Sequence, residues 1–262
     1  IKFKVNAILI TDKEGKASGV VSKTDIMSAY YAALPMESHL GDIMIGPPIV
    51  CKERDGLESV MEMMRTNGIY RVYVTEDSSY DVIGLLAYPD IVGLLYRFCR
   101  NCRHNYLFAG KHESDEAPAR RFTVKEVMTH RVESFEEGDD LNTLIEGLSQ
   151  YRFGAVLIKD ASGRAVGVVS KTDLIVAYRH GLSPDTKAKD IMSQGVRACP
   201  KDAYLAEAIQ QMILSDVLRL FVYEKEPDQI VGVLSFTDAA RIRSGSCSAC
   251  LASRIKIDDE AP

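Results

Sequence analysis

One heptapeptide, Gly-Val-Val-Ser-Lys-Thr-Asp, occurs twice in the chain, at 19–25 and at 167–173. The same offset of 148 residues relates further segments to one another: 42–44 to 190–192, 84–90 to 232–238, and Arg71 to Arg219. Chance does not keep a single register over segments that lie so far apart. The chain is therefore an internal duplication, and we expect its two halves to fold alike.

Each half divides again into two units of similar pattern. Apolar residues at i, i+3, i+4 and i+7 predict amphipathic helices that begin at Leu57, Leu141 and Leu205, and we interpret their apolar stripes as core-facing. Two short β-type runs joined by a polar turn follow each helix, as in hairpins. The first runs are Ala7–Thr11, Arg71–Thr75, Ala155–Lys159 and Leu220–Tyr223. A short lead-in strand, such as residues 48–50, precedes the helix.

A Thr-Asp or Pro-Asp pair follows the second β run and opens another helix, where Asp suits the N-cap and the helix dipole. The unit is thus strand, helix, strand, strand, helix, which predicts an α/β (α+β) fold. Residues 3–10 align with 151–158, so the first unit starts midway. Because a half-unit cannot close its core, we expect the native protein to extend at least a few tens of residues upstream.

Composition excludes several classes of partner. The formal net charge is −5 and the Lys and Arg residues are scattered, so no nucleic-acid partner is expected. No run approaches the roughly 20 apolar residues that span a bilayer, so no membrane insertion is expected. No signal peptide is visible in residues 1–10. We therefore expect a cytoplasmic globular protein whose cysteines are reduced.

The order of elements, with Gly-h-h-[Ser/Thr]-x-x-Asp at the last strand-to-helix junction, resembles the CBS (cystathionine-β-synthase) domain family. The resemblance runs from Ile1 to about Arg243, and four copies in register make it specific. It implies tandem βαββα CBS units that form two Bateman modules, packed as a pseudo-two-fold disc. It also implies a regulatory role and adenosine-containing ligands, such as AMP, ADP, ATP or S-adenosylmethionine, in clefts between paired units.

The resemblance and the repeat together give the expected domain bounds. The first Bateman module is expected at 1–110, with units at about 1–40 (truncated) and 41–104. A linker follows at 111–121. The second module is expected at 122–262, with units at about 122–182 and 187–245 and then a cysteine-containing tail. The polar composition of the middle segment is typical of a linker.

The junction motif also has a physical rationale for binding a sugar-phosphate. A carboxylate at the start of a helix can accept hydrogen bonds from both ribose hydroxyls. A hydroxyl three residues earlier can donate to phosphate, the helix N-terminus favours an anion, and an Arg from a neighbouring strand adds a charge-assisted bond. The residues carried over from the resemblance are Asp25, Asp90, Asp173 and Asp238 for ribose, Ser22, Ser170 and Ser235 as hydroxyl partners, and Arg71 and Arg219 for phosphate.

The cleft of Ser170, Asp173 and Arg219 is the strongest candidate, and its counterpart in the first half is Ser22, Asp25 and Arg71. Ala87 replaces the hydroxyl in the second unit, so the position at Asp90 lacks that donor. The strands equivalent to those of the arginines carry Asn6 and Gly154 in the first and third units. The alternative is that each Asp is only a helix cap, worth about 1 kcal/mol, and each Arg a surface ion pair.

The six cysteines also follow the repeat, as three pairs of equivalents: Cys51 with Cys199, Cys99 with Cys247, and Cys102 with Cys250. Both Cys-x-x-Cys motifs follow the closing helix of a half. If they meet near a pseudo-two-fold axis, their four thiolates suit tetrahedral zinc or an iron–sulfur cluster. Buried apolar fillers and a redox-active dithiol are the alternatives. We interpret Cys51 and Cys199, beside the lead-in strands, as core residues.

Two functions remain open from the sequence. The first is a nucleotide-sensing regulatory module without catalysis, acting on a partner protein, within a homodimer, or on an upstream segment. The second is a metal- or redox-responsive scaffold whose nucleotide clefts are vestigial. An enzyme is not expected, because no Ser-His-Asp or Cys-His constellation repeats; His39, for example, maps onto Lys187.

Overall fold

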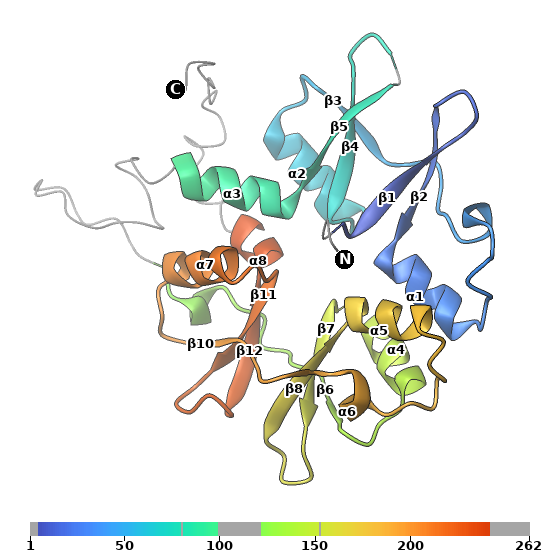
Figure 1. Cartoon of the computed structure of the whole chain (residues 1–262). Coiled ribbons are helices and arrows are strands. Elements are labelled where there is room, and N and C mark those ends of the chain that lie inside the picture. The colour runs from blue at the N-terminus through green and yellow to red at the C-terminus, as the bar shows by residue number, and fades with distance from the viewer. Residues whose placement is uncertain (1–4, 80, 99–121, 152, 242–262) are drawn as a thin grey trace, which may run out of the picture.

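The computed structural model describes residues 5–79, 81–98, 122–151 and 153–241. These residues form an α/β fold of four small sheets and the helices that accompany them. Figure 1 shows four units arranged in a ring, in the order first, second, fourth, third. The predicted fold class, tandem α/β units packed as a disc, is confirmed.

The first and third units share a hairpin and a closing helix. The first unit contains β1 (Ala7–Thr11), β2 (Ala17–Ser22) and α1 (Lys23–Tyr31). The third contains the 3-10 turn η3 (Val124–Glu126), β6 (Ser134–Glu136), α4 (Leu141–Gln150), β7 (Ala155–Lys159), β8 (Ala165–Ser170) and α5 (Lys171–Arg179). Within the described residues, the first unit has no counterpart of β6 or α4. Its Ile8 is 46% exposed, whereas the equivalent Val156, in the strand that α4 packs against, is 1% exposed.

The second and fourth units are both complete. The second contains the 3-10 turn η1 (Leu40–Asp42), β3 (Val50–Lys52), α2 (Leu57–Thr66), β4 (Arg71–Thr75), β5 (Val82–Ala87) and α3 (Tyr88–Phe98). The fourth contains α6 (Ala188–Ile191), β9 (Ser193–Gln194), β10 (Ala198–Pro200), α7 (Leu205–Leu214), β11 (Arg219–Tyr223), β12 (Ile230–Ser235) and α8 (Phe236–Arg241). Among the described residues, no helix is long and apolar enough to cross a membrane.

Two predicted strand positions are wrong by one or two residues. The lead-in strand expected at 48–50 lies at Val50–Lys52, where Val50 pairs in parallel with Tyr73. Pro48 has no N–H to contribute to that ladder. The strand expected to begin at Leu220 begins at Arg219, which is held in register opposite Ser235.

All four hairpins carry an irregularity at the same place, which shows how closely the units agree. The register shifts between Ile10 and Thr11 in the first unit and at the equivalent step in the other three. In the first and third units the turn is held by an Asp, Asp12 or Asp160, whose carboxylate accepts backbone N–H bonds within the turn. The turn then closes through a glycine at positive φ.

Lead-in segments cross from one unit of a pair to the other. Ile45, at the start of the second unit, pairs with Val20 in the first, and β9 (Ser193–Gln194) of the fourth unit pairs with β8 of the third. In the opposite direction, Thr129 of the third unit pairs with Val233 of the fourth. These crossings join the two units of each half.

Glycines in the receiving strands allow this close approach. A Cβ added at any of three of them would lie 2.5–2.8 Å from a methionine sulfur of the crossing segment. The pairs are Gly19 with Met44, Gly167 with Met192, and Gly232 with Met128. The fourth equivalent, Gly84 in β5, has only Val74 Cβ at 4.0 Å, and the side chain of the neighbouring Leu85 is 53% exposed.

The hydrophobic cores run between the halves rather than within them. One core joins the first and third units, where Met27 and Tyr30 of α1 pack with Leu144 and Leu174. The other joins the second and fourth units through α3 and α8, with Met64 and Met212 both fully buried. Like units of the two halves therefore pair through apolar burial, which is the dominant favourable contribution to such packing.

A symmetric aromatic contact marks the pseudo-two-fold axis between α1 and α5. The rings of Tyr30 and Tyr178 stack with centroids 4.8 Å apart and an interplanar angle of 19°. The hydroxyl of Tyr30 donates to the carbonyl of Leu182 over 2.8 Å, and that of Tyr178 donates to the carbonyl of Leu34. Each residue of this set is 148 positions from its counterpart.

Candidate functional site

The strand-to-helix junctions are built as capping boxes. Ser22 is the N-cap of α1, and Oδ2 of Asp25 accepts hydrogen bonds of 2.7 Å from both the backbone N–H and the hydroxyl of Ser22. Ser170 and Asp173 repeat this arrangement at 2.8 and 2.6 Å. The expectation that Asp itself is the N-cap is wrong: Ser takes that position, and Asp is the third helical residue. The Ser22 hydroxyl oxygen accepts hydrogen bonds from the N–H groups of Thr24 and Asp25.

The other two junctions differ from each other. In the fourth unit, Ser235 and Asp238 form the same pair of bonds, at 2.8 and 2.6 Å. In the second unit, where Ala87 replaces the serine, Asp90 accepts one bond of 2.9 Å from the backbone N–H of Ala87. Asp90 is exposed, whereas the Asp residues of the other three junctions are partly buried.

One oxygen of each of these carboxylates serves the cap, and the other remains available. Across the part of the chain that the structure describes, Oδ1 of Asp25 and of Asp173 takes no hydrogen bond. One oxygen of this third helical residue thus closes the capping box, while the other can accept a bond from a bound molecule. The single proton of each serine hydroxyl is donated to its own Asp, so donation to a ligand would require that proton to turn.

Arg71 brings the second unit into contact with the first at this junction. Its Nη1 donates to the carbonyl of Ala7 over 3.0 Å, and Ala7 is the residue that pairs with Ser22 across β1 and β2. The guanidinium therefore lies beside the start of α1. The predicted grouping of Ser22, Asp25 and Arg71 is what the geometry brings together.

Arg219 occupies the equivalent place in the second half, seated against a glycine. A Cβ added to Gly154 would lie 2.1 Å from Nη2 of Arg219, so the guanidinium rests where a side chain would otherwise be. Gly154 accepts the N–H of Lys171 over 3.2 Å, at the start of α5. Arg219 thus lies next to the Ser170–Asp173 junction, as the sequence predicted.

Neither arginine forms a surface ion pair. Within the described ranges, no carboxylate lies within 4.0 Å of the guanidinium of Arg71 or Arg219. Burial lowers the pKa of Arg219, and the more distant Tyr70 and Asp238 oppose that effect. Burial also lowers the pKa of Arg71. Both guanidinium groups are therefore cations that contact no neutralising group in the described part of the chain.

Two lysines that the sequence analysis did not select complete the site. Lys23 donates to Thr172 Oγ1 over 2.7 Å, and Lys171 donates to Thr24 Oγ1 over 2.8 Å. All four residues belong to the repeated heptapeptide. The exact identity of its two copies was therefore a signal in the sequence that could have identified these lysines. These reciprocal bonds join the two junctions across the halves.

The charges of the two junctions also influence one another. The pKa of Lys171 is lowered to about 8, first by burial and then by repulsion from Arg219, against attraction by Asp25. The pKa of Lys23 is lowered by burial and by repulsion from Arg71 and, less, Arg219, against attraction by Asp173. Lysines and arginines from different units therefore lie close enough to repel.

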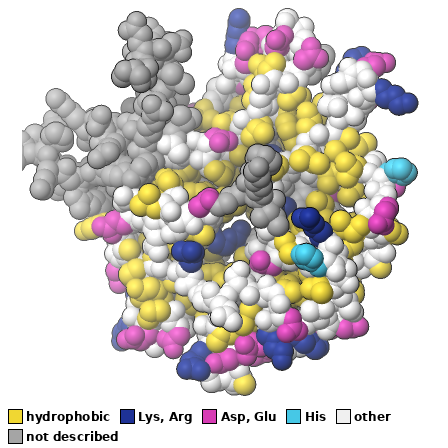
Figure 2. Space-filling view, viewed as in Figure 1, with side chains coloured by type: hydrophobic (Ala, Val, Ile, Leu, Met, Phe, Trp, Pro, Cys, Tyr) yellow, Lys and Arg dark blue, Asp and Glu magenta, His cyan; other side chains and the backbone are white. Residues whose placement is uncertain are grey.

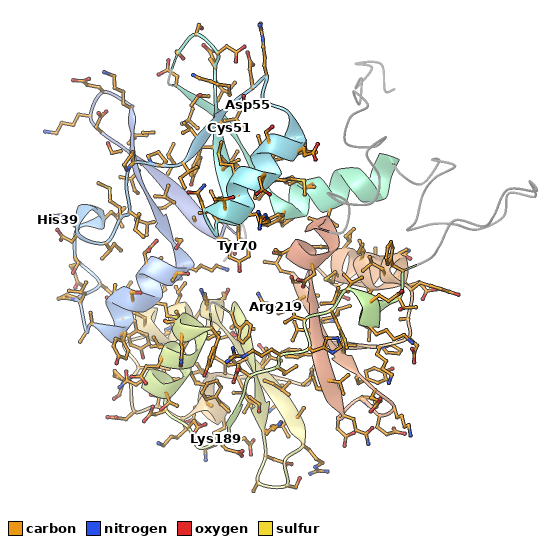
Figure 3. The ribbon with its side chains drawn as sticks, turned by 180° about the vertical axis from the view of Figure 1, so that it is seen from behind. His39, Cys51, Asp55, Tyr70, Lys189 and Arg219 are labelled. Carbon is orange, nitrogen blue, oxygen red and sulfur yellow. The ribbon has the colours of Figure 1, made fainter. Side chains whose placement is uncertain are left out.

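Arg219 lies toward the middle of the ring (Figure 3). Figure 3 shows Arg219 and Tyr70 near the centre, from the fourth and second units, whereas His39 and Lys189 lie at the outside. Figure 2 shows Lys and Arg side chains toward the middle of one face. We call Lys23, Arg71, Lys171 and Arg219 the central cation cluster.

The cysteines divide into two groups. Cys51 and Cys199 are buried in the core shared by the second and fourth units, as predicted. Burial raises the pKa of the Cys199 thiol to about 11, which keeps it protonated and unreactive. Cys99, Cys102, Cys247 and Cys250, the predicted metal ligands, lie outside the described residues. Within the residues that are described, no three His, Cys, Asp or Glu side chains are grouped for a metal ion.

Comparison with curated proteins finds two archaeal relatives. The chain is 21% identical over 186 residues to the uncharacterized protein MJ1225 of Methanocaldococcus jannaschii, which covers 71% of this chain and 64% of that protein. It is 25% identical over 97 residues to the uncharacterized protein MK0525 of Methanopyrus kandleri, covering 36% and 49%. The matches thus span less than two thirds of either relative.

Comparison with solved structures shows the same fold. The crystal structure of MJ1225, described as a proposed archaeal homolog of g-AMPK, matches with a TM-score of 0.73 at 17% identity, over 92% of this chain and 89% of that one. An uncharacterized conserved protein from Pyrococcus horikoshii matches with a TM-score of 0.59 at 20% identity, over 91% of both chains.

The profile of one domain family matches most of the chain. It covers residues 40–97, 124–180 and 188–245, which correspond to the second, third and fourth units. The profile is that of the CBS domain. The units that it matches carry the lead-in crossings and capped junctions described above. The chain therefore belongs to the CBS domain family.

Proposed function

We propose that the chain is a regulatory module that binds adenosine-containing nucleotides in the clefts between paired CBS units, with no catalysis of its own. CBS domain proteins are generally regulatory. The proposed ligand is AMP, ADP, ATP or S-adenosylmethionine, and the proposed target of regulation is a partner protein.

The central cation cluster is the observation that carries this proposal. Lys23 and Lys171 begin α1 and α5, and Arg71 and Arg219 begin β4 and β11. Among the described residues these four cations have no carboxylate in contact, although the chain as a whole has a net charge of −5. Removing a cation from water without pairing it is unfavourable. A bound anion such as phosphate offsets that penalty, so the cluster suits a phosphorylated ligand.

The neighbouring carboxylates suit the ribose of the same ligand. We assign the ribose hydroxyls to Oδ1 of Asp173 in the second half and of Asp25 in the first, and the phosphate to Arg219 and Arg71. Asp238, with Ser235, is a further candidate. Asp90 is the weakest, because it is exposed and Ala87 supplies no hydroxyl.

Regulation follows from the way each cleft is assembled. Arg71 belongs to the second unit but contacts Ala7 of the first, so a ligand held there bridges two units. The lysines then extend the contact to the other half, since Lys171 donates to Thr24. A ligand that binds one relative arrangement of units more tightly shifts the population toward it. The ring can thereby report ligand binding to a partner protein.

Calorimetry with AMP, ADP, ATP and S-adenosylmethionine tests the proposal. At least one should bind, and Arg219→Met should weaken that binding by about ten- to a hundredfold, since a bond to a charged group contributes about 1.5–3 kcal/mol. Arg54→Met is the matched control: its side chain is 84% exposed, so the same loss of charge should leave affinity unchanged. No heat with any of the four ligands, or equal affinities in both variants, would refute the assignment.

A further inference from the structure

The first half carries a buried hydroxyl that forms no hydrogen bond of normal geometry with the described residues. Tyr73 in β4 is 5% exposed, and its Oη is buried without a hydrogen-bond partner among the described residues. A buried hydroxyl left unpaired is unfavourable. The equivalent residue in the second half is Phe221, 3% exposed in β11. The packing at this position is therefore satisfied by the ring alone, so the hydroxyl has no packing role that Phe221 lacks.

Tyr73 lies on the face of β4 that meets the first unit. Side chains two residues apart on a strand point to the same face, so Tyr73 shares the face of Arg71. Arg71 donates from that face to the carbonyl of Ala7 in β1. The residue between them, Val72, points the other way into the core shared with the fourth unit. The Tyr73 side chain is thus on the face of β4 from which Arg71 reaches the first unit.

The guanidinium of Arg71 lies near this hydroxyl. Burial raises the pKa of Tyr73, and the positive charge of Arg71 partly opposes that effect. Contact with the guanidinium lowers the pKa of Tyr73 as well, although the two groups do not meet normal hydrogen-bond geometry. Both are donors: the guanidinium has no acceptor oxygen, and a phenol beside a cation presents its proton elsewhere. Two buried donors side by side are suited to one anionic oxygen placed between them.

We propose that the Tyr73 hydroxyl donates a hydrogen bond to the anionic group of the ligand that Arg71 holds. This inference rests on the proposed function and adds a difference between the halves. The first-half cleft then prefers phosphorylated adenosine ligands over uncharged adenosine more strongly than the second-half cleft, where Phe221 supplies no donor. Tyr73 is in this sense a specificity-determining residue.

The test measures AMP and adenosine binding to the full chain with the second half disabled by Asp173→Asn and Asp238→Asn. In that background Tyr73→Phe should weaken AMP binding by about tenfold, the effect of one bond to a charged group, and leave adenosine binding unchanged. The ligand-free Tm should not fall, because the variant removes an unpaired buried hydroxyl. An unchanged AMP affinity, or a lower ligand-free Tm, would overturn the inference.

The repeat supplies the reciprocal variant. With the first half disabled by Asp25→Asn and Asp90→Asn, Phe221→Tyr should strengthen AMP binding and lower the ligand-free Tm. Weaker or equal AMP binding counts against the inference. Arg71→Met distinguishes failure of the proposed nucleotide binding from failure of the proposed role of Tyr73. If Arg71→Met weakens AMP binding and Tyr73→Phe does not, only this inference fails; if wild-type protein binds neither AMP nor adenosine, the proposed function fails and the inference with it.

Discussion

The amine of Lys171 lies 2.8 Å from Thr24 Oγ1, and the repeat-related pair, Lys23 and Thr172, is joined over 2.7 Å. The two copies of the heptapeptide therefore contact each other across the pseudo-two-fold axis. At such an axis a residue meets the counterpart of its own neighbour, so two identical copies form the same contact twice. This gives a structural reason for the two copies to share one sequence.

Ligand affinity should fall as the pH rises through about 8, because Lys171 loses its proton there. An anion bound beside this lysine favours its charged form, so binding takes up protons near pH 8. Calorimetry with AMP from pH 6.5 to 9.5 should show a decrease of up to about tenfold per pH unit above the break. Lys171→Met should remove the break, and a wild-type affinity that is flat from pH 7 to 9 would contradict the assignment.

The same lysine should make the ligand-free protein more stable in alkali. The pKa of Lys171 is about 8 in the fold, below its ordinary value of 10.5, so between these values the unfolded chain binds more protons. Below pH 8 the amine is charged in both states and the penalty of burying it is complete. Above pH 8 the folded state sheds the proton, and the free energy of unfolding should rise until about pH 10.5. Urea unfolding of wild type and Lys171→Met, compared over this range, measures the difference.

Tyr30 should matter more for stability than the adjacent Tyr31. Tyr30 is 4% exposed, stacks on Tyr178 and donates to the carbonyl of Leu182, so Tyr30→Ala should lower the free energy of unfolding by about 3–5 kcal/mol and Tyr30→Phe by about 1 kcal/mol. Tyr31 is 49% exposed, and its bond to Glu146 is at the surface. Tyr31→Phe should change stability by less than about 0.5 kcal/mol. Urea denaturation measures all three; equal effects of the two Phe variants would argue against the axis contact.

Gly167 and Gly84 occupy equivalent strand positions but should respond oppositely to alanine. A Cβ at Gly167 would lie 2.7 Å from the sulfur of Met192 and 2.8 Å from the backbone oxygen of Ser193, so Gly167→Ala should destabilise by about 1–3 kcal/mol. Gly84 has nothing nearer than Val74 Cβ at 4.0 Å, so Gly84→Ala should be neutral or stabilise by up to about 1 kcal/mol. Thermal unfolding of both variants is the measurement. A destabilised Gly84→Ala would show that β5 is covered as the other strands are.

The repeat predicted the architecture of each unit because that architecture depends on the local spacing of apolar residues. Hairpin runs such as Ala7–Thr11 and the helix at Leu141 lie as expected, since alternation and helical spacing determine which face is buried. The grouping of Arg71 with Ser22 came from the resemblance to the CBS family, and the structure places Arg71 on Ala7, the residue that pairs with Ser22. For the packing of the two halves, the sequence predicted a disc but none of the residue contacts that join them.

The contacts between halves depend on packing that no local pattern encodes. Lys23 and Thr172 are 149 residues apart, and nothing in their neighbourhoods specifies that one donates to the other. The contact of the Arg219 guanidinium with Gly154 could not be predicted either. The sequence shows only that Gly154 is equivalent to Asn6 of the first half. Such long-range placement follows from how cores join, as Met27 and Leu144 do across the halves.

The seat of Arg219 on Gly154 should therefore be separable from the stability of the fold. The methyl group of Gly154→Ala would lie 2.1 Å from Nη2 of Arg219, and the guanidinium, at the end of a flexible side chain, has to move away. The free energy of unfolding should change by less than about 1 kcal/mol, while AMP affinity in the second-half cleft should fall by about tenfold as the charge is displaced. Asn6→Ala, the equivalent position in the first half, is the control and should leave second-half affinity unchanged. If Gly154→Ala unfolds the protein, or if it leaves AMP binding intact, then Arg219 is a structural residue rather than a ligand contact.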